Sequence, residues 1–440
     1  MKITPLESWI FRKIDSSKKH LTRQEIETYQ LEKLRETIAW ARRKSNFYRA
    51  SLSNFDEEAF CCLEDLGRLP FTTAEDIRRN PLQFLCVSQS EINRVVTLPT
   101  SGTTGEPKRV YFTVADQELT IDFFRSGMST FVDTGDKVLI LFPGKRPGSV
   151  GELLGKALAR QGASGILHVP GTDARSTLQV IAREKVDALV GIPAQVLALA
   201  RHRPGNGGAP RNVLLSADYV PEAIVHELRQ AWGCEVFAHY GMAEMGYGGG
   251  VECKAHFGYH MREADFFFEI VDPVTGRRVE DGISGEVAFT TLTRRGMPLI
   301  RYRTGDISRF IAESCPCGTI LKSLEKVERR SGGNVKLGST GDLSMTELDE
   351  ALFPLPGLLD FSADLTREND RDRLRIEILT MKANGKHLAD LARSAVRAIH
   401  AVRAACEEEA LFVSIDVRRK GQIVSNTSGK RRITDLRPQG

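Results

Sequence analysis

The stretch LPTSGTTGEPKRVYFT, residues 98–113, places four hydroxyl side chains around two glycines and continues into a Pro-Lys pair. Glycine adopts backbone conformations that other residues avoid, and hydroxyl and backbone N–H groups are uncharged donors that form concave anion sites. A lysine adds positive charge, so the stretch predicts a loop that grips a polyphosphate. The residues of this loop are Thr100, Ser101, Gly102, Thr103, Thr104, Gly105 and Lys108.

Two common nucleotide-binding patterns do not fit this loop. Neither GxxxxGK[ST] nor GxGxxG can be threaded through it, which excludes a Walker A loop and the glycine loops of kinases and Rossmann folds. A flexible Gly/Thr linker is the alternative interpretation. Linkers seldom lie between two β-rich runs, however, and this loop is flanked by RVVTLP and KRVYFT.

The composition restricts the class of protein. The chain has 440 residues, 41% of them hydrophobic and 27% charged, which is typical of a soluble globular protein with more than one domain. Its 61 basic and 57 acidic residues are too balanced to indicate a nucleic-acid or membrane-surface partner. The N-terminus has no signal-peptide core, and no apolar run is long enough to span a bilayer. We therefore expect a cytoplasmic protein whose eight cysteines are thiols or metal ligands, not disulfides.

Between about residue 136 and residue 240, short apolar runs alternate with helical patterns. This βαβ rhythm predicts a parallel sheet with a site at the strand ends. Helical periodicity also marks the entry segment, residues 20–52. The expected strands are 137–144, 164–171, 187–193, 211–217 and 234–241, and the expected helices are 150–161, 174–185 and 221–232.

The pattern then changes to strands joined by turns. DFFFEIVDP, GEVAFTTL and DISRFI predict a small antiparallel region. A Gly-rich joint follows residue 330, and after it a smaller segment has expected strands at 373–379 and 411–417 and a helix at 385–402. The predicted fold class is therefore α/β, with a large N-terminal part and a smaller C-terminal part.

Four further motifs carry the functional interpretation: HYGMAEMGYGGGVEC (239–253), RYRTGDISRF (301–310), VERRSGGNVKLG (327–338) and TSGKRRITDLR (427–437). Together with TSGTTGEPK, in this order and at these separations, they resemble the acyl-adenylate-forming ligases, most closely the phenylacetate–CoA ligase branch. LPFTTAEDIRRNP and the helical entry segment match the same branch, so the resemblance covers the whole chain. It implies an adenylation domain over residues 1–328 and a small mobile α+β domain over 329–440.

The resemblance assigns chemistry to individual residues. A carboxylate attacks the α-phosphate of ATP, and the loop of Thr100 to Lys108 holds the β- and γ-phosphates. Lys430, Glu244 and Thr104 are the implied catalytic residues, and Glu244 is also the implied Mg²⁺ ligand. The other implied nucleotide-binding residues are Ser216, Ala217, Asp218, Tyr240, Gly241, Met242, Ala243, Asp306 and Arg329.

Within this set, Tyr240 would stack on adenine, Asp306 would accept hydrogen bonds from both ribose hydroxyls, and Arg329 would contact ribose or phosphate. The alternatives are a core tyrosine for Tyr240, a turn aspartate for Asp306 and an ordinary helix-start acid for Glu244. An acyl pocket is expected against Tyr240, Gly246, Gly248 and Gly249, where a flat ring can approach the backbone.

The C-terminal motif and the joint differ in how well they match. Lys430 in TSGKRR matches the lysine that bridges the α-phosphate and the carboxylate before the small domain rotates. A solvated basic tail is the alternative interpretation. The joint of the family reads Gly-Arg-x-Asp-Asp, whereas this chain has Glu328-Arg329-Arg330-Ser331-Gly332. The hinge acid is missing, which leaves the second half-reaction less well supported than adenylation.

A structural Zn²⁺ site is also expected. Thiolates and imidazole suit zinc, and three cysteines with one histidine complete a tetrahedron. CPC spacing by itself is weak, but some members of the branch combine CPCG with an upstream Cys and His. The expected ligands are Cys253, His260, Cys315 and Cys317, with His256 as the alternative imidazole and reduced buried thiols as the alternative interpretation.

The sequence thus predicts a ligase that uses ATP and Mg²⁺ to convert a small carboxylic acid, aryl or arylacetic in the family, into an acyl-adenylate and then a CoA thioester. Three alternatives stay open: loading of a carrier-protein thiol, adenylylation of a cofactor, and a non-catalytic nucleotide-binding protein. The resemblance also implies a homodimer, and the sequence indicates neither nucleic acid nor membrane as a partner.

Overall fold

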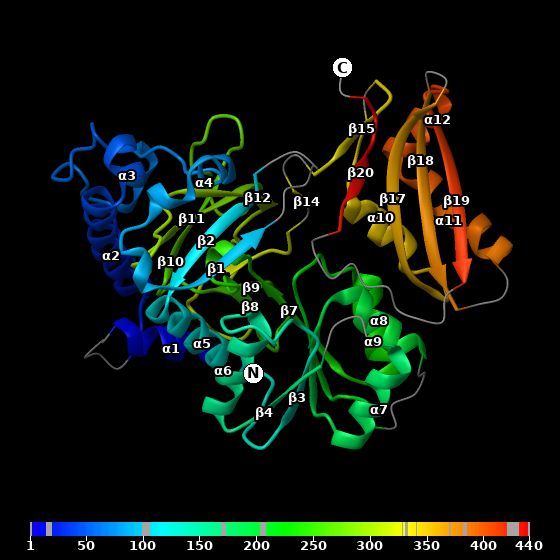
Figure 1. The fold of residues 1–440 in the computed structure, drawn as a ribbon, viewed down its shortest axis with the longest axis horizontal. Coiled ribbons are helices and arrows are strands. Elements are labelled where there is room, and N and C mark those ends of the chain that lie inside the picture. Colours follow the sequence, from blue (N-terminus) through cyan, green and yellow to red (C-terminus); the bar gives the residue numbers. More distant parts are fainter. Residues whose placement is uncertain are drawn as a thin grey trace. The chain divides into compact units, whose positions relative to one another are not determined.

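The computed structural model describes residues 2–14, 20–98, 106–168, 173–202, 208–327, 329–330, 333–339, 341–368, 371–381, 385–419 and 431–438. The chain forms two compact units, one of residues 1–135, 143–165 and 237–326, the other of 136–142, 166–236 and 327–440. Helices and both parallel and antiparallel strands are present, which confirms the α/β class (Figure 1). The domain boundary at residue 328 stays a prediction.

The first unit begins with α1 (Pro5–Ile14), which was not expected. The helical entry segment expected over 20–52 contains α2 (Arg23–Lys44) and α3 (Asn46–Ser51). Thr22 caps α2, because its hydroxyl accepts from the Glu25 backbone N–H while the Glu25 carboxylate accepts from the Thr22 backbone. Ile26, Leu34 and Ile38 lie on its buried face at helical spacing. The remaining short helices of this unit are η1 (Leu63–Arg68), α4 (Ala74–Arg79), η2 (Pro81–Phe84) and η3 (Gln89–Glu91).

Antiparallel strands frame the rest of the first unit. β1 (Ile92–Leu98) and β2 (Lys108–Thr113) pair so that Leu98 lies opposite Lys108, and α5 (Val114–Met128) follows directly. The predicted antiparallel region is confirmed by the pairing of β10 (Phe266–Val271), β11 (Gly285–Thr291) and β12 (Tyr302–Ser308). A second antiparallel set contains β7 (Glu235–Tyr240), β8 (Gly250–Glu252), β9 (Tyr259–Met261) and β13 (Ser323–Leu324).

The second unit contains the predicted parallel strands. β5 (Ala188–Gly191) pairs in parallel with both β3 (Lys137–Ile140) and β6 (Asn212–Leu215). All four residues of β5 are buried, as expected for a strand covered on both faces. The second unit also contains α7 (Ala174–Glu184), α8 (Pro193–His202) and α9 (Glu222–Trp232). The other elements of the βαβ region are α6 (Val150–Gln161), which belongs to the first unit, and β4 (Ser164–Leu167), which has residues in both.

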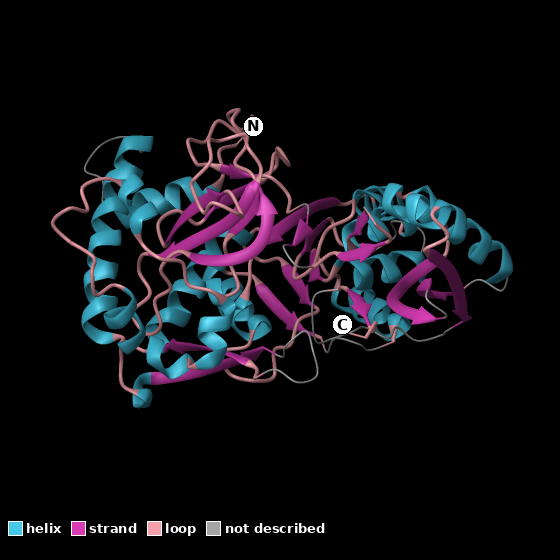
Figure 2. Ribbon diagram, turned by 90° about the horizontal axis from the view of Figure 1, so that it is seen from above, coloured by secondary structure: helices cyan, strands magenta, loops and turns pink. Residues whose placement is uncertain are grey.

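The C-terminal part of the second unit is an α+β module. Its sheet has β18 (Arg371–Thr380) antiparallel to β17 (Leu358–Glu368) and parallel to β19 (Leu411–Arg419), with β20 (Ile433–Asp435) parallel to β17. Figures 1 and 2 show these strands side by side, with helices along them. The other elements are β14 (Arg329–Arg330), β15 (Val335–Leu337), β16 (Gly341–Leu343), α10 (Met345–Leu352), α11 (Gly385–Ala398) and α12 (His400–Glu407). Within the described residues, no helix has both the length and the apolarity needed to cross a membrane.

A buried acidic cluster lies in this module around Asp349 of α10. Burial raises the pKa of Asp349 to about 8, Arg431 opposes that rise, and Asp218, Asp360 and Glu350 add to it. The folded protein therefore holds this proton more tightly than the unfolded chain does.

The Asp349 cluster predicts a specific pH dependence of stability. Between about pH 4 and pH 8 the unfolded chain loses the Asp349 proton while the folded protein keeps it, so its contribution to stability decreases as pH rises through this window. Asp349→Asn mimics the protonated acid. Its melting temperature should therefore decrease less between pH 5 and pH 8 than that of the wild type. Thermal unfolding followed by circular dichroism measures both, and equal changes in the two proteins would contradict the prediction.

Candidate active site

Several predicted site residues lie outside the described part of the chain. These are Thr100, Ser101, Gly102, Thr103, Thr104, Gly105 and Lys430. The structure does describe both ends of the phosphate-loop segment, because the register of β1 and β2 pairs Leu98 with Lys108. Lys108 therefore starts a strand whose position is determined by a backbone ladder.

Lys108 and Glu244 meet in the first unit although they are 136 residues apart. The Lys108 ammonium forms an ion pair with Glu244, and the Tyr302 hydroxyl donates to Glu244 Oε1 at 3.0 Å. Lys108 Nζ also donates to Tyr302 Oη at 3.0 Å. Together the three side chains come from β2, the short helix η4 (Ala243–Met245) and β12.

The electrostatics of this group keep Glu244 charged. Burial by itself would raise the pKa of Glu244, but the charge and hydrogen bond of Lys108, with the Tyr302 hydroxyl, hold that pKa below its usual range. A buried carboxylate in its anionic form suits a hard divalent cation. The donor chemistry at Glu244 thus fits the Mg²⁺ that an ATP-dependent reaction needs.

Tyr240 and Asp306 form a second pair in the same unit. The Tyr240 hydroxyl donates to Asp306 Oδ2 at 3.0 Å, and the Thr304 hydroxyl accepts from the Asp306 backbone N–H at 3.0 Å. The Asp306 side chain has no solvent-exposed surface. The Tyr240 contact orients the carboxylate and brings two residues from separate motifs into direct contact, whereas the Thr304 contact holds the Asp306 backbone.

The glycines after Glu244 pack closely against other parts of the first unit. A Cβ at Gly248 would lie 2.5 Å from the Phe123 ring, and one at Gly246, whose φ is +63°, would lie 2.7 Å from Thr120 Oγ1. A Cβ at Gly241 would meet the Tyr247 carbonyl oxygen at 2.5 Å. In the described residues these glycines thus allow close packing with α5 and with the turn itself, and an acyl pocket against them stays a prediction.

Of the other predicted nucleotide-binding residues, Met242 and Ala243 lie at the start of η4 in the first unit, and the rest belong to the second unit. Ser216 extends the ladder after β6, because its N–H donates to the Gly191 carbonyl oxygen at 3.1 Å. Ala217 follows with φ 72°, a left-handed conformation that a residue with a Cβ adopts only at a cost, and such conformations concentrate at functional sites. The Asp218 carboxylate accepts from the next backbone N–H at 3.0 Å. Arg329 lies at the start of β14 and is exposed.

A cluster of three cysteines and one histidine lies in the first unit. Cys253, His260, Cys315 and Cys317 are buried, and their potential ligand atoms all lie within 4.8 Å of one another. The Cys253 and Cys315 sulfur atoms are 3.7 Å apart, and Cys317 Sγ lies 3.6 Å from His260 Nε2. A zinc tetrahedron with Zn–S of about 2.3 Å and Zn–N of about 2.1 Å has S–S edges of about 3.8 Å and S–N edges of about 3.6 Å.

The environment of His260 also suits a metal ligand. Burial lowers the pKa of His260 to about 4, so the imidazole is neutral near pH 7. Ser323 Oγ lies 3.3 Å from His260 Nδ1, which leaves Nε2 directed at the thiols. His256, the alternative imidazole, instead contacts Glu252 at 3.4 Å and packs beside the Phe237 ring, so it is not part of the cluster.

Tyr302 contacts two predicted site residues, although the sequence interpretation did not include it. Its hydroxyl links Lys108 to Glu244, and it lies in the same RYRTGD motif as Asp306. That motif was the available signal, but nothing local indicates which of its side chains faces Glu244.

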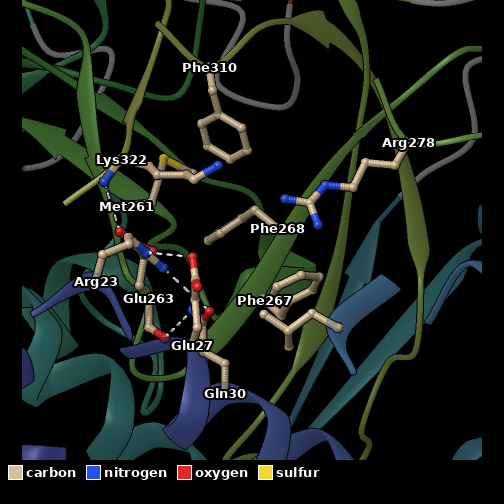
Figure 3. A pocket seen from close by; sticks show the side chains of 11 residues that line it. Arg23, Glu27, Gln30, Met261, Glu263, Phe267, Phe268, Arg278, Phe310 and Lys322 are labelled. Atoms are coloured by element: carbon tan, nitrogen blue, oxygen red, sulfur yellow. Dashed lines mark hydrogen bonds and ion pairs between the residues drawn. The ribbon is translucent and has the colours of Figure 1, made fainter. Parts of the chain in front are cut away.

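A separate cavity lies between α2 and the strands of the first unit. Figure 3 shows Arg23 beside Glu27 and Glu263 on one side and Phe267, Phe268 and Phe310 on the other. Arg23 forms ion pairs with Glu27 at 3.1 Å and with Glu263 at 2.5 Å. Among the described residues, no predicted catalytic or nucleotide-binding residue lines this cavity, so the contacts among the motif residues define the candidate site.

Comparison with known proteins shows the family of the chain. The AMP-binding enzyme family matches residues 61–292. A phenylacetate–coenzyme A ligase of Thermus thermophilus is 27% identical over 458 residues, covering 95% of this chain and 98% of the relative. A phenylacetate–coenzyme A ligase of Pseudomonas putida is 28% identical and covers 84% of each chain. In fold, the chain is similar to a 2-hydroxyisobutyryl-CoA ligase structure in the postadenylation state, with TM-score 0.78, 21% identity and coverage of 94% and 90%.

Proposed function

Because the chain belongs to the AMP-binding enzyme family, and to its phenylacetate–CoA ligase-like branch, we propose that it activates a carboxylic acid with ATP and transfers the acyl group to CoA. The single observation that carries the proposal is the meeting of Lys108, Glu244 and Tyr302 at one point in the first unit. An aryl or arylacetic acid is the proposed substrate class, in line with the named relatives.

Different described residues would have different roles in adenylation. Two anions must approach each other when a carboxylate attacks the α-phosphate, so positive charge and donors are needed where negative charge accumulates. Lys108 supplies positive charge at the end of the phosphate-loop segment, and Tyr302 holds the Glu244 carboxylate in place. Mg²⁺, held through Glu244, would neutralise phosphate charge when bound. Asp306, oriented by Tyr240, would accept hydrogen bonds from the ribose hydroxyls.

Lys430 and the zinc cluster complete the proposal. Lys430 would bridge the α-phosphate and the carboxylate, and the C-terminal domain would then rotate so that CoA can attack. Zn²⁺ bound by Cys253, His260, Cys315 and Cys317 would be structural, because four protein ligands leave no open position for a substrate. The spacing of these ligand atoms supports this part of the proposal.

A screen of carboxylic acids by ATP–pyrophosphate exchange, run with and without CoA, tests the function. We expect acid-dependent exchange without CoA and formation of AMP and a thioester when CoA is added. Exchange without any thioester would instead indicate a carrier-protein thiol or another acceptor. The absence of exchange with every acid, in protein that binds ATP, would indicate a non-catalytic nucleotide-binding protein.

Asp306→Ala should weaken both half-reactions, because the ribose is held in each of them. Loss of hydrogen bonds to a charged group costs about 1.5–3 kcal/mol, which corresponds to roughly ten- to hundredfold in rate. Separate assays of pyrophosphate exchange and of thioester formation from synthetic acyl-adenylate measure the two effects. Tyr240→Phe keeps the carboxylate and removes only its 3.0 Å donor, so it should cause a smaller loss in both. A loss confined to one half-reaction would contradict the ribose assignment.

We also propose that the protein is a homodimer in the cytoplasm. This assignment follows the family resemblance, and light scattering of the purified protein checks the oligomeric state. A monomer across the working concentration range would refute it.

A further inference from the structure

Arg431 follows Lys430 directly in the chain, and its guanidinium contacts two carboxylates and a backbone carbonyl oxygen. Its side chain is 12% exposed, and Nη1 lies 3.3 Å from Asp349 Oδ1 and 3.4 Å from Asp360 Oδ1. Nη2 donates to the Phe361 carbonyl oxygen at 3.0 Å. One guanidinium thus joins the chain after Lys430 to both α10 and β17.

Two aromatic rings complete the set of groups that contact this guanidinium. Its central carbon lies 4.2 Å from the centre of the Phe361 ring and 4.8 Å from that of Phe353. A planar guanidinium can stack on rings and contact several acceptors at once, whereas an ammonium is a compact point charge. These contacts therefore require an arginine side chain and not merely a positive charge.

The helix that Arg431 contacts is itself held to the loop after β6. The Tyr219 hydroxyl donates to Glu350 Oε1 at 2.7 Å, and the Glu222 backbone N–H donates to the same oxygen at 3.2 Å. Glu350 is the next residue after Asp349, and Tyr219 follows the predicted nucleotide-binding residue Asp218. Contacts therefore run without a break from Arg431 through α10 to Tyr219, which is next to the predicted nucleotide-binding residue Asp218.

We infer that Arg431 is a positioning residue for adenylation, which holds the chain next to Lys430 at a set place on α10 and β17. Adjacent Cα atoms are about 3.8 Å apart, so a residue seated this firmly restricts where its neighbour can go. A displacement of about 1 Å at a catalytic group can cost roughly a hundredfold in rate. This inference rests on the proposed function, because Arg431 affects adenylation only through the catalytic role proposed for Lys430.

The test compares Arg431→Ala and Arg431→Lys with Arg437→Ala. Arg437 is a matched control, since it anchors the chain just beyond β20 through Asp372 at 2.7 Å and the Lys336 carbonyl oxygen at 2.8 Å. We expect all three variants to lower the melting temperature. Only the two Arg431 variants should lower the kcat of pyrophosphate exchange by about tenfold or more, with KM for ATP within about twofold of wild type. Thioester formation from synthetic acyl-adenylate should stay near wild type in all three.

A double-mutant cycle separates positioning from general destabilisation. In a Lys430→Ala background, Arg431→Ala should change residual exchange by less than about twofold, because its effect acts through the lysine. Additive losses, or an Arg431→Ala profile equal to that of Arg437→Ala, would overturn the inference while leaving the proposed function intact. If Lys430→Ala itself leaves exchange unchanged, the proposed role of the lysine fails and the inference fails with it.

Discussion

Lys430→Ala should lose acid-dependent pyrophosphate exchange by about a hundred- to thousandfold while binding ATP nearly as well as the wild type. The lysine charge offsets a repulsion that arises only as the carboxylate and the α-phosphate close on each other. It therefore stabilises the transition state more than the ATP complex, and its removal should appear in kcat and not in ATP affinity. Pyrophosphate exchange and isothermal titration of ATP measure the two quantities.

The second half-reaction distinguishes a rotating domain from a fixed one. With synthetic acyl-adenylate and CoA supplied, Lys430→Ala should form thioester close to the wild-type rate, because the rotated domain has carried residue 430 away. Arg432→Ala is the matched control, since Arg432 belongs to the same basic run but is exposed, and it should change neither rate. Equal losses in both half-reactions for Lys430→Ala would rule out the rotation. An unchanged exchange rate would show that the motif is a solvated tail.

Loss of zinc should destabilise the protein more than an ordinary substitution does. Purified protein should carry about one zinc per chain, and Cys315→Ser should lower both the zinc content and the melting temperature. Structural zinc binds zinc-finger peptides with about 10–16 kcal/mol of apparent free energy, whereas most single substitutions cost about 0.5–3 kcal/mol. Elemental analysis and calorimetry measure the two effects.

A cysteine outside the cluster provides the control for the zinc experiment. Cys234 is buried as fully as Cys315, so Cys234→Ser disturbs a core thiol without removing a predicted ligand. It should keep its zinc even if its melting temperature decreases. Activity of Cys315→Ser should decline only as the protein unfolds. Metal analysis that finds no zinc in undamaged wild-type protein would make the cluster a group of ordinary thiols.

Secondary structure could be predicted from local sequence where an element has one buried face. The helix expected over 150–161 is found as Val150–Gln161, and the one expected over 174–185 as Ala174–Glu184. The helix Pro193–His202 was not expected, because its residues are buried from Pro193 through Ala200 and no polar face marks its period. A helix shows a periodic pattern of polar and apolar residues only when one of its faces is exposed to water.

The candidate site was predicted residue by residue, but not its internal contacts. Lys108, Glu244 and Asp306 stood out because their motifs resemble those of a family. Nothing in the motifs indicates that Lys108 pairs with Glu244, or that the Tyr302 hydroxyl joins them. Such contacts depend on how β2, η4 and β12 pack, and packing is a property of the folded chain.

The cluster of three cysteines and one histidine shows the same division between sequence and tertiary structure. The sequence by itself determined the residue types: Cys315 and Cys317 in one short turn, with Cys253, His256 and His260 upstream. Only the tertiary structure decided between the imidazoles. His260 lies on β9 opposite Ser323 of β13, which places its ring among the three thiols. His256 occupies a turn with φ 50° and has its ring against Phe237. A difference of four residues gives no preference in the sequence, because strand register and turn geometry determine which ring reaches the sulfur atoms.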